Sequence, residues 1–171
     1  MKRIAIFLIF AFFISIIASC GNKEIETAPS HFGSLAVFTI ADKERKQLSP
    51  DDQRELHRVM TWLNRDIVDL LRDNSFEVVL LNDMKNYSSS MGPLFIINFE
   101  FFDPGATASL PQGRMGSPIS SIDLKYKILD ERGALLAEWQ DGEHSIKGGT
   151  YCARTLNRRA ITKIVDYFAP R

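Results

Sequence analysis

The chain has 171 residues, in which 21 lysine and arginine residues are balanced by 21 aspartate and glutamate residues, and only two cysteines. Binding to nucleic acid through charge needs a clustered basic footprint, so this balance argues against a nucleic-acid-binding protein. Two cysteines are too few for a disulfide-stapled scaffold. The length therefore predicts one domain that buries its own hydrophobic core.

The amino terminus is the first element along the chain. A short basic stretch, Met1-Lys2-Arg3, precedes residues 4–17, which are apolar except for Ser15. Fourteen helical residues rise about 21 Å, which is short of the ~30 Å hydrocarbon core of a bilayer. The segment is therefore interpreted as an export signal and not as a transmembrane helix.

The sequence Ile17-Ala18-Ser19-Cys20 resembles the lipobox of bacterial lipoproteins. The resemblance implies that residues 1–19 are a signal peptide, that cleavage falls between Ser19 and Cys20, and that Cys20 carries the lipid anchor. Several acyl chains would hold the protein stably on a membrane. The residue after the cysteine is Gly21, and an aspartate there would resemble an inner-membrane retention signal. An outer-membrane location facing the periplasm is therefore expected. The alternative is an ordinary cleaved signal followed by an incidental cysteine.

Residues 20–31 are interpreted as the lipidated cysteine and a polar tether, with a reach of about 18 Å for its eleven flexible residues. Removal of residues 1–19 takes away Lys2 and Arg3 and leaves 19 basic and 21 acidic residues. Residues 32–171 are predicted to form a single α/β domain.

Within this domain the pattern of apolar residues predicts the elements in chain order. A strand is expected at residues 34–41, and a helix from the N-cap Ser49 to Asn74. Strands follow at residues 76–81 and 94–102, the latter with Phe95, Ile97, Phe99 and Phe101 on one face. A hairpin turns at residues 130–133, with Leu135, Ala137 and Trp139 returning on one face. A closing helix carries Leu156, Ala160, Ile161, Ile164, Val165 and Phe168.

The order β-α-β-β-β-β-α predicts an α+β fold, with a single mixed β-sheet and two helices packed on one face. The second half of the domain contains a set of residues that suggests a family: Gly105, Arg114, Gly116, Asp130, Gly133, Gly148 and Gly149. In these residues the chain resembles bacterial envelope lipoproteins grouped as domain of unknown function 4410. The resemblance spans residues 32–168 and implies a compact periplasmic domain on a lipid anchor, with no activity to carry over.

No catalytic, metal-binding or cofactor-binding motif is found in the sequence. His31, His57 and His144 do not have zinc-ligand spacing, and no nucleophile motif or phosphate-binding loop is present. Cys152 is interpreted as a small, partly buried residue, with a reactive thiol at a helix start as the alternative. The protein is therefore expected not to be an enzyme and to need no cofactor.

Three surfaces are predicted as candidate binding sites. The loop of residues 103–118 contains Gly105, Gly113, Arg114 and Gly116, whose guanidinium group and accessible backbone amides suit an anion. Trp62 lies away from the apolar stripe of its helix, and exposed tryptophan is a frequent interface anchor. The alternative for Trp62 is that the tether or the long loop of residues 103–118 folds over it. A basic face on the last helix, Arg154, Arg158, Arg159 and Lys163, is a second candidate partner contact, unless it is simply solvated.

Two hypotheses for the function follow from these features. The first is a membrane-anchored envelope lipoprotein that acts as a non-enzymatic interaction or assembly domain for an envelope protein partner. The second is a periplasm-facing binding module for a small molecule, glycan or lipid, which uses the loop of residues 103–118.

Overall fold

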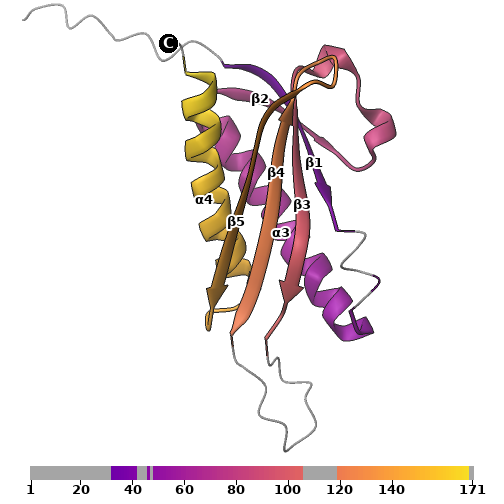
Figure 1. Ribbon diagram of the computed structural model, residues 1–171, viewed down its shortest axis with the longest axis vertical. Helices are drawn as coiled ribbons and strands as arrows, with labels where there is room; N and C mark the ends of the chain where they lie inside the picture. Colours follow the sequence, from indigo (N-terminus) through magenta and orange to yellow (C-terminus); the bar gives the residue numbers. More distant parts are fainter. Residues whose placement is uncertain (1–31, 42–45, 47, 106–118, 170–171) are drawn as a thin grey trace, which may run out of the picture. The chain divides into compact units, whose positions relative to one another are not determined.

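The computed structural model describes residues 32–41, 46, 48–105 and 119–169. They form one five-stranded mixed sheet in the order β2-β1-β3-β4-β5 with two long helices (Figure 1). This arrangement confirms the predicted fold class. The elements in chain order are β1 (Gly33–Ile40), α3 (Pro50–Asp73), β2 (Phe76–Leu81), the 3-10 helices η1 (Met84–Asn86) and η2 (Ser89–Met91), β3 (Leu94–Asp103), β4 (Ser120–Leu129), β5 (Leu135–Ser145) and α4 (Gly149–Phe168).

Strand direction divides the sheet into two halves. β1 is parallel to both β2 and β3, whereas β3, β4 and β5 are antiparallel neighbours. The parallel pair β1 and β2 requires a crossover, and α3 supplies it. The two edges of the sheet are therefore β2, which pairs with β1, and β5, which pairs with β4.

The start and end of α3 follow from local chemistry. Ser49 is the N-cap, and its hydroxyl oxygen accepts a hydrogen bond from the Asp52 N–H at 3.3 Å. Pro50 occupies the first helical turn with Asp51 and Asp52, and Asn74 is the C-cap. These residues satisfy backbone groups that a helix end leaves unpaired and complement the helix dipole. Both predicted ends are confirmed.

Both helices pack on the same face of the sheet, as Figure 1 shows. The core there joins the buried stripe of α3 and that of α4 to the side chains on one face of β1, β3 and β4. Phe95, Tyr126 and Trp139 form an aromatic stack across three strands, with Tyr126 and Trp139 ring centroids 5.0 Å apart. Helical residues in this core are Leu56, Val59, Met60, Leu63, Ile67, Leu71, Cys152, Ala153, Leu156, Ala160, Ile161 and Ile164.

The opposite face of the sheet has a smaller apolar cluster around Ala36, Leu81 and Leu94. Tyr87 and Met91, from the segment that carries η1 and η2, pack against this cluster. The Tyr87 hydroxyl donates a hydrogen bond to the Gly92 carbonyl at 2.9 Å and helps to hold this segment in shape.

Two bulges change the predicted pattern of buried residues. The register of β3 against β4 shifts between Phe99 and Phe101, so Phe102 turns into the core and Phe101 is 46% exposed. A second shift between Ile128 and Leu129 places Leu135 opposite Leu129, and Leu135 is 57% exposed. The predictions that Phe101 and Leu135 share a face with the core residues of their strands are therefore wrong, because one extra residue reverses the side-chain alternation.

A search of the described residues for a helix long and apolar enough to cross a membrane finds none.

Candidate functional site

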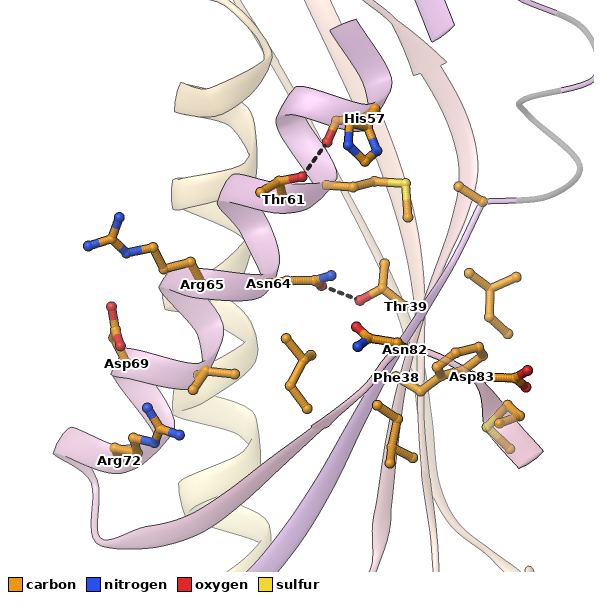
Figure 2. A pocket seen from close by; sticks show the side chains of 17 residues that line it. Phe38, Thr39, His57, Thr61, Asn64, Arg65, Asp69, Arg72, Asn82 and Asp83 are labelled. Atoms are coloured by element: carbon orange, nitrogen blue, oxygen red, sulfur yellow. Dashed lines mark hydrogen bonds between the residues drawn. The ribbon is translucent and has the colours of Figure 1, made fainter. Parts of the chain in front are cut away.

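The described residues enclose an open cleft of about 1130 Å³ between α3 and the carboxyl ends of β1 and β2. In open α/β sheets, ligands commonly bind beyond the carboxyl ends of parallel strands. Figure 2 shows the side chains that line this cleft. The lining residues are Phe38, Thr39, Ile40, Ala41, His57, Met60, Thr61, Asn64, Arg65, Val68, Asp69, Arg72, Leu80, Leu81, Asn82, Asp83 and Met84.

One wall of the cleft is a stripe along α3. His57, Thr61, Asn64, Val68 and Arg72 follow one another at three- or four-residue spacing, which places them on one side of a helix. Asn64 reaches across to β1, where the Thr39 hydroxyl donates a hydrogen bond to its side-chain oxygen at 2.5 Å (Figure 2). This bond joins α3 to β1 and fixes the separation of these two elements beside the cleft.

The other wall of the cleft belongs to β2 and the residues that follow it. Leu80 and Met84 line the cleft and are 39% and 38% exposed, and Val79 on the opposite side of the strand is 39% exposed. Phe76 and Val78 pack on the helix side, so the alternation of a strand places Leu80 on that side as well. An edge strand thus displays exposed apolar side chains on both of its faces.

The charges of the cleft lie along its rim. Arg65 and Asp69 extend from α3 away from the strands, and Arg72 lies in the last turn of α3 before β2 (Figure 2). Asp83 accepts a hydrogen bond from the Lys85 N–H at 2.9 Å and caps η1. Among the described residues, Arg72 makes no ion pair with a carboxylate. Its guanidinium group is available to a bound molecule.

The predicted partner residues lie away from this cleft, and Trp62 and Arg159 already have contacts within the domain. Trp62 is half-buried against the core, and the Arg154 guanidinium lies over its ring, 5.1 Å from the centroid. Arg154 of α4 thus covers Trp62, whereas the alternative interpretation expected the tether or the long loop to do so. Lys163 lies over Trp139 in the same way, at 5.6 Å.

Arg159 is also engaged within the domain. Its guanidinium group forms ion pairs with Asp141 at 3.2 Å and Glu143 at 2.6 Å, both on β5. Arg158, on the same helix, is exposed. The basic face of α4 is therefore used largely to cover tryptophan rings and to pair with acidic residues of β5, and Arg158 remains the candidate contact for a partner.

The predicted ligand loop lies mostly outside the described residues, which include Gly105 but not Gly113, Arg114 or Gly116. Gly105 has a φ of 75°, and a Cβ there would come within 2.9 Å of the Ile119 backbone. This close approach between the end of β3 and the start of β4 explains why residue 105 is a glycine. The predicted cleavage and lipidation residues, Ser19 and Cys20, and the tether also lie outside the described part of the chain.

Cys152 is fully buried at the start of α4, where its thiol donates a weak hydrogen bond to the Ser120 carbonyl at 3.6 Å. Burial raises the pKa of this thiol, and the nearby Glu143 carboxylate raises it further. Reactive cysteines need a stabilised thiolate and access. Cys152 is therefore a core residue, which favours the interpretation of a packed side chain. No group of histidine, cysteine, aspartate and glutamate residues suited to a metal ion occurs in the described ranges.

The cleft was not predicted from the sequence. Its residues come from β1, α3, β2, η1 and the residues that flank them, and none of the predicted site residues Trp62, Arg158, Arg159 and Gly105 is among those that line it. One signal was present in the sequence. The segment of residues 76–81, FEVVLL, carries a single charge for an edge strand, although such strands are usually protected by charge or proline.

No protein-family model matches the chain, and no curated protein matches it either. Membership of domain of unknown function 4410 therefore stays a prediction.

Solved structures that resemble the chain include bacterial lipoproteins. The PelC dodecamer from Paraburkholderia phytofirmans is 13% identical, with 83% of this chain and 92% of that chain covered and a TM-score of 0.49. The minor lipoprotein from Acinetobacter baumannii is 9% identical, with 77% and 92% covered and a TM-score of 0.39. The uncharacterized lipoprotein B from Nitrosomonas europaea is 11% identical, with 80% and 86% covered and a TM-score of 0.35. At these identities and scores the similarities carry no argument about the function of this chain.

Proposed function

We propose that the protein is a lipid-anchored lipoprotein of the bacterial cell envelope, whose folded domain acts without catalysis by binding another envelope protein. Cys20 carries the anchor in this proposal, and the tether of residues 21–31 keeps the domain close to an outer membrane, on its periplasmic side. The anchor is supported by the order of a basic stretch, an apolar segment and the lipobox-like residues that end at Cys20.

The observation that carries the binding role is the cleft beside β2. Leu80 and Met84 are exposed apolar side chains that line this cleft, and Val79 is exposed on the other face of the same strand. Clustered exposed apolar surface is typical of protein interaction sites, whereas scattered single residues are ordinary. The cleft is also open and, at about 1130 Å³, larger than the ~300–1,000 Å³ common for small-molecule sites.

Cross-linking in intact cells tests this role. A photoreactive amino acid placed at Met84 is expected to give a reproducible adduct with one envelope protein. The matched control is Leu136 on β5, which is also 38% exposed but lies far from the cleft along the sheet order. No adduct at Met84, or equal adducts at both positions, would count against an interaction domain.

The anchor has its own test. Intact mass and membrane fractionation of the wild type are compared with those of Cys20→Ser. A diacylated or triacylated mass and membrane association are expected for the wild type, and release from the membrane for the variant. An unlipidated and soluble wild type would remove the lipoprotein part of the proposal.

A second candidate function is binding of a small molecule, glycan or lipid. Its support is the polar group of Thr39, Asn64 and Asn82 inside the cleft, which could orient a ligand by hydrogen bonds. Thermal stabilisation of the purified domain by envelope lipids or glycans, lost in Asn64→Ala, would favour this candidate. A melting temperature that none of these compounds changes would exclude it for the compounds tested.

A further inference from the structure

We infer that the partner binds by adding one extended segment to the open edge of β2, with the side chains on one face of that segment entering the cleft against α3. This inference rests on the proposed interaction function and names the chemistry of the partner. The segment is apolar at alternate positions and carries an acidic side chain near Arg72.

The backbone of β2 is the first argument. β2 pairs with β1 on one side, and among the described residues no strand pairs with its other side. Alternate N–H and C=O groups of Glu77–Leu81 therefore point outward from the sheet. Such a row is a template for another extended chain, and peptide recognition by strand addition uses it for affinity.

The side chains beside this edge are the second argument. A strand added to β2 would continue the pleat, so its residues would alternate between the cleft side and the opposite face. On the cleft side they would meet Leu80 and the α3 residues Val68 and Thr61. On the opposite face they would meet Val79, which is 39% exposed. Leu80 and Val68 on one side, and Val79 on the other, favour apolar side chains in the added segment.

The positive charge of Arg72, at the end of the cleft, is the third argument. Arg72 lies at the end of α3, next to the turn into β2. It lines the cleft, and no described carboxylate pairs with it. A guanidinium group at such a place binds a carboxylate by paired hydrogen bonds. An acidic side chain of the partner is therefore expected at this end of the added segment.

A second copy of this chain is a less suitable occupant than a foreign segment. Pairing of β2 with β2 about a two-fold axis brings the same surfaces of two copies together. Each copy would then bring its own α3 as well as its β2, so a helix, and not side chains alone, would have to fit beside the cleft of the other copy. A bare extended segment brings only side chains into the cleft and can supply an acidic side chain for Arg72.

The test uses the full-length chain and the complex cross-linked through Met84. Hydrogen–deuterium exchange is measured for β2 and β5 in the complex and in the free chain. Strand addition is expected to slow exchange of the outward amides of β2 at least tenfold and to leave β5 unchanged. If the adduct forms but β2 exchange is unchanged, strand addition is overturned while the proposed function stands. If no adduct forms, both fail.

Matched variants complete the test. Val79→Lys places a charge on the edge, as natural edge strands do, and should lower the adduct yield at least tenfold. Leu136→Lys, at equal exposure on β5, should not change the yield. Arg72→Glu should lower the yield severalfold, and Arg132→Glu, at an exposed position in the turn between β4 and β5, should not. An unchanged yield in both Val79→Lys and Arg72→Glu would overturn the inference, as would an adduct with the mass of two copies of this chain.

Discussion

The two edge strands of the sheet, β2 and β5, differ in how well their unpaired backbone is protected from pairing with another chain. β2 is short and has one charged residue, Glu77, among six. β5 has eleven residues, and its charged side chains are held by partners. Glu138 pairs with Lys125 and Lys127, while Asp141 and Glu143 pair with Arg159 from α4. Charged side chains and bulges hinder pairing with another chain.

The apolar residues of β5 fit the same interpretation. Leu135 and Leu136 are exposed, but they lie where the register against β4 shifts. A bulge interrupts the regular ladder and twists the strand locally. The exposed apolar residues of β2 lie on a strand whose register against β1 is continuous. If β2 is the docking edge that we propose, exposed leucines alone are not sufficient for one, because a regular open backbone must accompany them.

The largest expected effect comes from the core that supports both edges. Leu63 of α3 is fully buried, and Leu63→Ala should lower the free energy of unfolding by ~2–5 kcal/mol because it leaves a cavity. Urea denaturation measures this change. A loss below ~1 kcal/mol would mean that the helical layer packs less tightly on the sheet than the structure shows.

Substitution of two glycines by alanine is expected to destabilise the fold more near β1 and β2 than on β5. Gly92 has a φ of 81°, and a Cβ there would collide with the Ser34 backbone carbonyl of β1. Gly142 on β5 would place its Cβ against the Asp123 carboxylate, which is a side chain that can move. Gly92→Ala should therefore cost ~1–3 kcal/mol, and Gly142→Ala about 0.5 kcal/mol.

Thermal unfolding of the two glycine variants under one set of conditions measures this difference. Equal losses would mean that the segment of residues 82–93 can move away from β1, and that the apolar cluster around Ala36 does not depend on it.

A smaller effect is expected from the ion pairs that hold β5 to α4. Arg159→Ala removes both pairs and leaves Asp141 and Glu143 without their cation. Exposed pairs contribute little, so a loss of about 1 kcal/mol is expected in low salt, and less in high salt. Arg158→Ala is the control and should change nothing. If both variants unfold like the wild type, the charges of β5 protect its edge without stabilising the domain.

The smallest expected effect is the dependence of stability on pH through the pKa of Glu138. The Lys125 hydrogen bond and the charges of Lys125 and Lys127 lower the pKa of Glu138. A carboxyl group with a lowered pKa in the folded state stabilises the fold at pH values above its unfolded pKa. That stability is lost as the pH falls through the folded pKa. NMR titration should show a lower Glu138 pKa in the wild type than in the variant with Lys125→Met and Lys127→Met. Equal values in the two proteins would contradict the pairing.

The sequence was sufficient to predict the fold because its local signals agree with the tertiary structure. Ser49, Pro50 and Asn74 mark the ends of α3, and the apolar period of the helix gives its buried face. Phe101 and Leu135 were assigned to the wrong face because a bulge depends on pairing with another strand, which a single strand's pattern does not contain.

The candidate site was harder to predict than the fold. Which strand becomes an edge depends on the order β2-β1-β3-β4-β5, and that order follows from packing rather than from any local motif. For Trp62, the local helix pattern was clear, but a tertiary contact changed the outcome. Its position on the helix indicated exposure, but Arg154 from a helix about ninety residues later covers its ring.

The central claim, that β2 accepts an extended segment, is tested most directly by a cross-link map made one residue at a time. Photoreactive groups are placed at Glu77, Val79, Leu80 and Leu81, and the attached partner residues are identified. Strand addition predicts that all four attach to one short segment, and that each two-residue step along β2 moves the attachment by two residues in the partner. Attachments scattered over several segments, or independent of the position along β2, would contradict it.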